Sequence, residues 1–402
     1  MVKIFMENAG ALRINLNTKN NNGVTAFHRA CQRGQWNVIN FFMLYASNYY
    51  GLRIDLNAKT KRGLTGFHLA CNSGHSNVLR SIMRNASYLN IDLNTKDNDG
   101  YTAFDLACQG GKSDAVKTFM KTAAALNLNI KSNTSVTAFH RACQRGHYNV
   151  VLTIMEYAST LRIDLNATTR GYTAFHMACN EGETDVVMIF MVNAPALGID
   201  LNRKNNDGNT AFHLACQRGK ANVVKILMEN AATLRINLDI KNNNGMTAFH
   251  KACQRGQLNV VKLFMEYPST LYYSGVDLNA IDKNGNTAFH LACDTAFHLA
   301  CQKDKLEVVK IFMENAVALS IDLNMKNNNG MTAFHLACKT YGTEDIVNIL
   351  MENADDLNID LNIKTSRAMY YCARAEKLSL ELESLQSEVE KFVARHIVRN
   401  SI

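Results

Sequence analysis

Residues 23–42, with the sequence GVTAFHRACQRGQWNVINFF, contain the pattern that decides the fold. Thr25 occupies an N-cap position, where its hydroxyl accepts an otherwise unpaired backbone N–H and starts a short helix. Phe27 and Cys31 then share one face of that helix by the 3.6-residue period. Gly34 supplies the positive φ that ends it. The stretch therefore predicts a short amphipathic helix with a defined start and a defined end.

A second helix and an extended arm complete the unit. Val38, Ile39, Phe42 and Met43 form the apolar stripe of the second helix. The alternating Ile-Asp-Leu-Asn of residues 54–57 predicts a short arm, and a polar turn then leads to the next threonine. One unit is predicted to be helix, helix and finger.

The same unit recurs along the chain. Thr-Ala-Phe-His or a close relative begins at ten threonines, and its regular steps are 35 to 40 residues. A fixed period in this range predicts a solenoid, in which each unit buries its apolar face only against its neighbours. The threonines are Thr25, Thr65, Thr102, Thr137, Thr173, Thr210, Thr247, Thr287, Thr295 and Thr332.

These units resemble the ankyrin repeat, whose pattern is G-x-T-P-L-H-x-A-A-x-x-G-x-x-x-V-V-x-x-L-L. Here Ala-Phe replaces Pro-Leu and Cys replaces the second Ala, over about residues 15–361. The resemblance implies an all-α fold, an α-solenoid of stacked helix-turn-helix repeats with short β-hairpin or finger loops. The period exceeds that of the family, and the surplus falls between the second helix and the finger. Asp105 replaces the motif His and Ser135 the turn Gly, so weaker joints are predicted there.

The units define the expected domains. Residues 1–14 are predicted to be a partial repeat with only its second helix, which indicates either a fragment or an incomplete gene model, and residues 15–361 hold about nine repeats. At residues 287–302, TAFHLACD runs directly into TAFHLACQ. Eight inserted residues are about 2.2 helical turns, so the two copies cannot dock equivalently. We expect one copy to form a first helix and the other a loop or a helical extension.

The tail, residues 362–402, loses the period and is predicted to be an amphipathic helix. Its apolar residues step by 4, 3, 4 and 3 at Leu378, Leu382, Leu385, Val389 and Phe392. It either caps the last repeat or pairs as a short coiled coil, which would give weak self-association. About two heptads are marginal for pairing, which favours the cap.

Composition restricts the class of protein. Of the 402 residues, 47% are apolar and 19% charged, which suffices for a core, and the net charge of +8 favours acidic partners. The longest apolar run, residues 186–192, falls short of a membrane span of about 20 residues, and the first residues lack a signal-peptide pattern. We therefore expect no membrane contact and a cytoplasmic or nuclear location.

The repeated His-x-x-Cys has two interpretations. His and Cys three residues apart lie on one helical face and could form a series of zinc half-sites. In the second, the His bonds the finger backbone, as the equivalent His does in ankyrin repeats, and the Cys is a small buried hydrophobe. Regular stacking separates equivalent side chains by about 8 to 10 Å, too far for zinc ligands or disulfides, so free inert thiols in a reducing compartment are favoured.

Nothing in the sequence indicates catalysis. It contains no G-x-S-x-G, Walker A, H-E-x-x-H or dinucleotide-binding pattern in its proper setting. The carboxylates Asp55, Asp92, Asp164 and Asp200 recur at one place in the unit, which is typical of turn and finger acceptors. We expect a non-enzymatic protein without a cofactor or metal.

The variable surface is the candidate site. The resemblance implies that the concave face of finger tips and first helices takes the partner, and like-charged pairs at i, i+4 on first helices suggest an acidic one. Finger lysines form a second basic row, and apolar residues follow the turns at Leu64, Val136 and four other positions. The candidate residues are Arg29, Arg33, Tyr101, Arg141, Arg145, Tyr172, Arg218, Met246, Lys251, Arg255, Lys303 and Met331. The finger lysines are Lys19, Lys59, Lys96, Lys131, Lys204, Lys241 and Lys326.

These rows are either a solvated face or a groove for an acidic segment with apolar anchors. Tyr49, Tyr50, Tyr272 and Tyr273 in the longer linkers are further anchors, or they pack on the convex helices. We expect a protein-binding scaffold. The alternatives are a polyanion or nucleic-acid binder, against which the lack of aromatic residues between the arginines argues, and the repeat region of a larger enzyme or channel.

Overall fold

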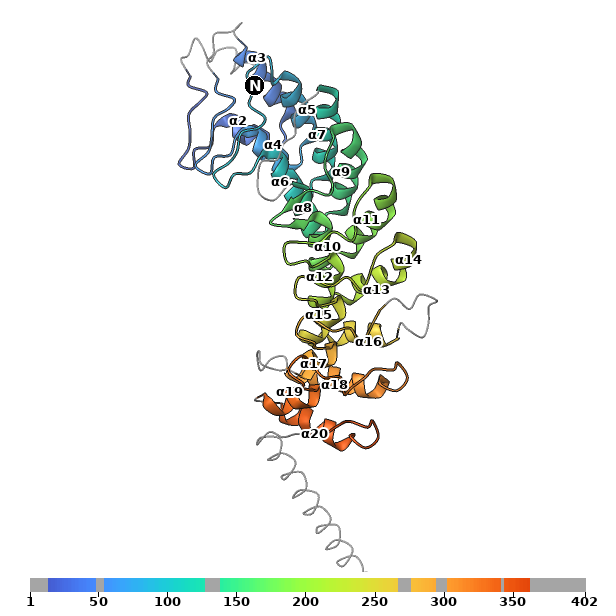
Figure 1. The fold of residues 1–402 in the computed structure, drawn as a ribbon. Coiled ribbons are helices and arrows are strands. Elements are labelled where there is room, and N and C mark those ends of the chain that lie inside the picture. The colour runs from blue at the N-terminus through green and yellow to red at the C-terminus, as the bar shows by residue number, and fades with distance from the viewer. Residues whose placement is uncertain are drawn as a thin grey trace, which may run out of the picture. The chain divides into compact units, whose positions relative to one another are not determined.

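The computed structural model describes residues 14–47, 54–126, 138–266, 276–293, 302–340 and 343–361. They belong to two compact units, Met1–Asn206 and Asp207–Ile402, whose helices are labelled in Figure 1. Each unit is a stack of helix pairs, and each helix contacts its counterpart in the next repeat. The predicted α-solenoid is confirmed.

In the first unit, the first helices pack side by side in chain order, and the second helices form a second layer against them. The first helices are α2 (Ala26–Gln32), α4 (Gly66–Ser73), α6 (Ala103–Gln109), α8 (Ala138–Gln144) and α10 (Ala174–Glu181). The second helices are α3 (Trp36–Ala46), α5 (Ser76–Asn85), α7 (Ser113–Leu126), α9 (Tyr148–Leu161) and α11 (Thr184–Leu197).

The second unit repeats this arrangement. Its first helices are α12 (Ala211–Gln217), α15 (Ala248–Gln254), α17 (Ala288–Cys293) and α19 (Ala333–Lys339). Its second helices are α13 (Ala221–Glu229) with the short α14 (Ala231–Leu234), then α16 (Leu258–Glu266), α18 (Gln302–Asn315) and α20 (Glu344–Glu352).

The threonine and histidine of the motif start each first helix together. Thr25 Oγ1 accepts the N–H of His28 at 3.4 Å, and the N–H of Thr25 donates to His28 Nδ1 at 3.1 Å. Because Nδ1 accepts, Nε2 carries the proton, and it donates to the carbonyl of Leu64 in the next finger at 3.1 Å. The predicted N-cap is confirmed, and the same side chain joins two repeats.

This bond to the next finger recurs in both units, which confirms the prediction that the motif His bonds the finger backbone. The pairs are His28–Leu64, His68–Tyr101, His140–Tyr172, His213–Met246, His250–Asn286 and His290–Met331. In α6 the replacement Asp105 keeps the helix start, since its Oδ2 accepts both the N–H and the hydroxyl of Thr102. The predicted weakness of that joint and of the one at Ser135 stays a prediction, because the following finger lies outside the described residues.

The core lies between the two helix layers and runs through each unit. Phe190 of α11 contacts Phe175 of its own repeat and Phe139 of the preceding one, with ring centroids 5.2 and 5.7 Å apart. Phe312 of α18 bridges Phe289 and Phe249 in the same way, at 5.1 and 5.6 Å. Each unit therefore buries its aromatic residues partly against a neighbour, as a solenoid requires.

The fingers are stacked turns. Among the described residues only one strand pair forms, β1 (Thr168–Thr169) with β2 (Tyr172–Thr173), antiparallel with Thr168 opposite Thr173. Elsewhere the aspartate of Asp-Leu-Asn closes a turn, as between Asp55 Oδ1 and the N–H of Asn57 at 3.0 Å. The predicted role of Asp55, Asp92, Asp164 and Asp200 as turn acceptors is confirmed.

The asparagine of the same motif is not singled out in the sequence analysis, yet in four of the described repeats it joins the finger to the next one. Asn57 Nδ2 donates to the carbonyl of Asn90 at 2.7 Å, and its Oδ1 accepts the N–H of Asp92 at 2.9 Å. Asn166, Asn279 and Asn324 make the same two bonds to the following repeat. The spacing of these asparagines was the signal for this role.

The long period and the doubled motif are the two irregular features of the repeats. The second helices α7, α9 and α11 each run for 14 residues, and α9 ends at the left-handed Arg162 with φ 53°. The predicted place of the surplus residues, between the second helix and the finger, stays a prediction. Of the doubled motif, the first copy forms α17, between α15 and α19. Apart from Gln302, which begins α18, the second copy lies outside the described residues. So do residues 1–13 of the partial repeat, the linker tyrosines and the tail.

Candidate partner-binding surface

The first helices present their cations to solvent because their other face is buried. In α2, Phe27 and Cys31 point into the core, which leaves Arg29 and Arg33 exposed. Arg29 Nη1 donates to the Gln32 side chain at 2.9 Å, so that residue carries a polar neighbour and no carboxylate. The two arginines that the sequence proposed on this helix are therefore exposed.

Arg141 and Tyr101 meet across two repeats. Arg141 lies on α8, and its guanidinium carbon is 4.2 Å from the centroid of the Tyr101 ring, which follows the turn of the preceding finger. This is a cation–π contact. Arg141 Nε is buried and has no hydrogen-bond partner among the described residues. Arg145, one turn later, is exposed. The sequence proposed these residues separately, and the stacking of repeats brings two of them together.

Tyr172 lies on β2 and is half-buried. Its carbonyl accepts from His140 Nε2 at 3.1 Å, and its ring lies edge-on to His176 with centroids 6.0 Å apart. The Tyr172 ring therefore packs against a side chain of its own repeat.

In the second unit the corresponding cations crowd one another. Lys251 on α15 is half-buried, and its pKa is lowered, first by burial and then by the positive charge of Arg255, against the opposing effect of Asp207. Arg255 and Arg218 are exposed caps at the ends of α15 and α12. This part of the surface carries unfavourable charge that an anion would relieve.

Three other candidates are placed less simply. Met246 is 8% exposed, so it contributes its carbonyl to His213 and little side-chain surface. Met331 is half-buried. Lys303 lies in α18, a second helix, rather than at the end of a first helix, because the first copy of the doubled motif already forms α17. The Lys303 side chain lies outside the described residues.

The described finger lysines are exposed, and three of them bond to the backbone of the next finger, whereas Lys131 lies outside the described residues. Lys19 Nζ donates to the carbonyl of Lys59 at 3.2 Å, and Lys59 Nζ to that of Lys96 at 3.5 Å. In the second unit, Lys241 Nζ donates to Ile281 at 2.8 Å. These lysines therefore connect successive fingers as well as lining the surface.

Comparison with known proteins gives the family. A family model for ankyrin repeats in three copies matches residues 44–130, 68–169, 160–237, 233–295 and 293–365. The chain belongs to the ankyrin repeat family. The crystal structure of the ankyrin repeat protein EF0377 is similar at 21% identity and a TM-score of 0.43, over 54% of this chain and 98% of that one. A comparison with curated proteins found no match.

Within these ankyrin repeats, the motif His and Cys are already engaged. Both ring nitrogens of His68 take part in hydrogen bonds, Nδ1 to Thr65 and Nε2 to Tyr101. Burial lowers the pKa of this His, which keeps it neutral, and burial raises the pKa of the Cys71 thiol. No group of three metal-binding side chains occurs in the part of the chain that the structure describes. The observed bonds agree with the second interpretation of His-x-x-Cys, in which the His bonds the finger backbone and the Cys is a small buried hydrophobe.

Ankyrin repeats are protein-interaction modules and are generally non-enzymatic. The described helices include none of the length and apolar character needed to cross a membrane.

Proposed function

We propose that this chain is a non-enzymatic scaffold that binds an acidic, apolar-anchored protein segment on its first-helix and finger face. The observation that carries the proposal is the pair Arg141 and Tyr101. The guanidinium is held against a ring from the preceding repeat, and its Nε is unbonded among the described residues. Ordering of the side chain in advance reduces the entropy lost on binding.

The chemistry of this pair favours a carboxylate beside an apolar side chain. A guanidinium bonds a carboxylate with two parallel N–H donors, and Arg and Tyr are the residues that most often dominate binding energy at interfaces. Arg145 adds a second cation one turn away. Charge would then set the association rate and the choice of partner, and contact with Tyr101 and Tyr172 would supply affinity.

The second unit supports the same polarity of partner. Burial lowers the pKa of Lys251, and the positive charge of Arg255, one helical turn later, lowers it further. A carboxylate placed between them would favour the charged form of Lys251. Partner binding should therefore be accompanied by uptake of protons at alkaline pH.

A peptide library tests the proposal even though the natural partner is unidentified. Random 16-residue peptides are selected on the full chain, and the affinity of enriched sequences is measured at low and at physiological salt. We expect enriched peptides to carry Asp or Glu beside Leu, Phe or Tyr. The double variant Arg141→Glu/Arg145→Glu should bind the enriched peptides at least about tenfold more weakly, which is the effect of losing one charged hydrogen bond.

The matched control reverses two arginines on the other helix layer of the same unit, Arg80→Glu/Arg84→Glu. It changes the net charge by the same amount but leaves the first helices untouched, so peptide affinity should stay near that of the natural chain. Enrichment of neutral or basic peptides, or equal binding to the Arg141/Arg145 variant, would exclude this surface. A steep log-log salt slope with single-stranded DNA, absent with peptides, would favour the nucleic-acid alternative instead.

The proposed setting is the cytoplasm or nucleus. Nine cysteines among the described residues are free and buried, which is typical of proteins in reducing compartments. The scaffold would serve either alone or as the repeat region of a larger protein.

A further inference from the structure

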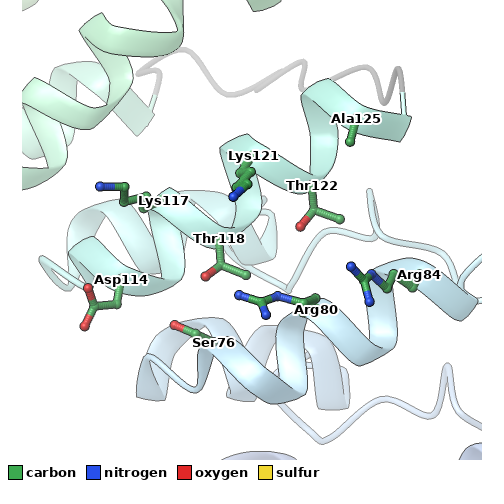
Figure 2. Close-up of a pocket in the computed structure, with 9 residues that line it drawn as sticks. All are labelled: Ser76, Arg80, Arg84, Asp114, Lys117, Thr118, Lys121, Thr122 and Ala125. Atoms are coloured by element: carbon green, nitrogen blue, oxygen red, sulfur yellow. The ribbon is translucent and has the colours of Figure 1, made fainter.

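A basic groove lies on the other helix layer of the first unit, away from the motif histidines. It runs between α5 and α7, encloses about 730 Å³ and is visible in Figure 2. Its cations come in like-charged i, i+4 pairs, Arg80 with Arg84 on α5 and Lys117 with Lys121 on α7. Figure 2 shows the two arginines reaching toward α7. The remaining lining residues are Ser76, Asp114, Thr118, Thr122 and Ala125.

Comparison of the repeats with one another shows that this charge is specific to two neighbours. In three repeats of the second unit, the same helix positions hold a Lys followed four residues later by a Glu, at 225/229, 262/266 and 310/314. Lys225 and Glu229 lie 4.0 Å apart. In α5 and α7 the glutamate position holds Arg84 and Lys121. In these two adjacent repeats, a second cation therefore stands where the other three repeats carry the glutamate that can neutralise the lysine.

The cations of the groove have no ion-pair partner among the described residues. Asp114 is the single carboxylate among the lining residues, and it lies at the end of the groove nearest Ser76 (Figure 2). Within the described ranges, none of the four cations makes a hydrogen bond or ion pair. Like charges at i, i+4 destabilise a helix slightly, so both helices carry a cost that an anion would remove.

We propose that this groove binds a compact ligand carrying two or more adjacent phosphate groups. The volume lies within the range of small-molecule sites, about 300 to 1,000 Å³. Stacked helices lie about 8 to 10 Å apart, and residues four apart on a helix are about 6 Å apart along its axis. The four cations therefore occupy the corners of an area that one phosphate cannot span and that neighbouring phosphates can.

The lining favours phosphate over a protein segment. Thr118 and Thr122 face the two arginines and can donate hydroxyl hydrogen bonds to phosphate oxygens (Figure 2). Arginine binds phosphate through two parallel donors, and lysine adds a point charge. Ala125 is the only apolar side chain in the lining. A protein segment would thus find no large apolar side chain of the kind that dominates protein interfaces.

Titration calorimetry with the full chain tests the site, with inositol hexakisphosphate and tripolyphosphate as probes. We expect saturable one-to-one binding of at least one of them at physiological salt. The double variant Arg84→Glu/Lys121→Glu should weaken it by about 100-fold, because two charged hydrogen bonds are replaced by repulsion. This variant gives α5 and α7 the residue that the chain itself carries at positions 229, 266 and 314, so the fold should be retained. Its circular dichroism and melting temperature check this, and Arg80→Gln/Lys117→Gln provides a second variant.

Three controls fix the meaning of the result. Lys225→Gln/Lys262→Gln removes cations from the same repeat positions in the second unit and should leave probe affinity unchanged. Arg141→Glu/Arg145→Glu should also leave it unchanged, so failure here and failure of the proposed partner surface are separable. Binding to vesicles with phosphatidylinositol bisphosphate is compared with binding to phosphatidylserine vesicles. Preference for the bisphosphate vesicles would assign the phosphates to a lipid headgroup, and binding of the soluble probes alone would assign them to a soluble molecule. Both results support the site.

Other outcomes overturn the proposal. Orthophosphate binding as tightly as the polyphosphates would show that the cations do not act together. A polyglutamate peptide binding as tightly would assign the groove to acidic protein segments. Equal affinity of the natural chain and the Arg84/Lys121 variant would place any phosphate binding elsewhere.

Discussion

The stacking of fingers can be tested by adding one methyl group at Gly63. This residue has φ +77° and lies in the turn where the next finger crosses. A Cβ built there would lie 2.7 Å from the backbone nitrogen of Asn98, far inside normal contact. We expect Gly63→Ala to displace the next finger. Gly74→Ala is the matched control, because Gly74 has nearly the same φ, +82°, but its nearest atom is Cδ of the flexible Lys112 side chain at 3.3 Å.

The magnitudes follow from the contacts. Both alanines bear the left-handed backbone cost of about 1 to 2 kcal/mol. Gly63→Ala in addition strains the bond from the Asn98 N–H to the Arg62 carbonyl at 3.1 Å and the bond from Asn98 Nδ2 to the Lys61 carbonyl at 2.9 Å. At about 1 kcal/mol each, their loss adds about 2 kcal/mol. The free energy of unfolding should therefore fall by about 3 to 4 kcal/mol at Gly63 and by about 1 to 2 kcal/mol at Gly74.

Urea denaturation followed by circular dichroism measures both values, with the slope of the transition compared to check that the same unit unfolds. Hydrogen exchange should report faster exchange at Asn98 in Gly63→Ala and no change there in Gly74→Ala. Equal destabilisation by the two substitutions would refute the reasoning, because it would mean that backbone conformation alone, and not contact between fingers, sets the cost.

Three further outcomes are expected. Five motif histidines have a lowered pKa, among them His28 and His250, and are neutral in the folded chain. Their contribution to the free energy of unfolding is therefore fully present above pH 6.5 and is lost as the pH falls toward their folded pKa. The loss is at most about 1.4 kcal/mol per pH unit for each histidine. A urea midpoint that does not move between pH 7.5 and 5.5 would contradict this. Asn57→Ala removes two bonds to the next finger and should cost about 1 to 2 kcal/mol, whereas the exposed Asn72→Ala should cost nearly nothing in the same urea assay. With Ellman's reagent, the nine described thiols of the native chain should react far more slowly than after denaturation, because each is buried, and rapid reaction of three or more of the eleven would contradict the burial.

Much of the fold was predictable because each repeat carries its own instructions. Thr25 and His28 start a helix from residues three apart, Gly34 ends it, and the period of Phe27 and Cys31 orients it. Repetition of these local signals predicts stacking, since no single unit can bury its apolar face. The bond from the motif His to the next finger followed from the family resemblance.

The tertiary structure alone decided which side chains of different repeats meet. Arg141 and Tyr101 are 40 residues apart in the sequence, and the cations of α5 and α7 are separated by a full repeat. Local sequence therefore does not determine that these side chains lie close together. Such contacts depend on finger turns and on repeat steps that vary from 35 to 40 residues. Met246 shows the same limit, because its burial is set by the neighbouring repeat. The sequence by itself determined the repeated unit and its inward face; the outward surface was decided by stacking, which places side chains from distant segments side by side.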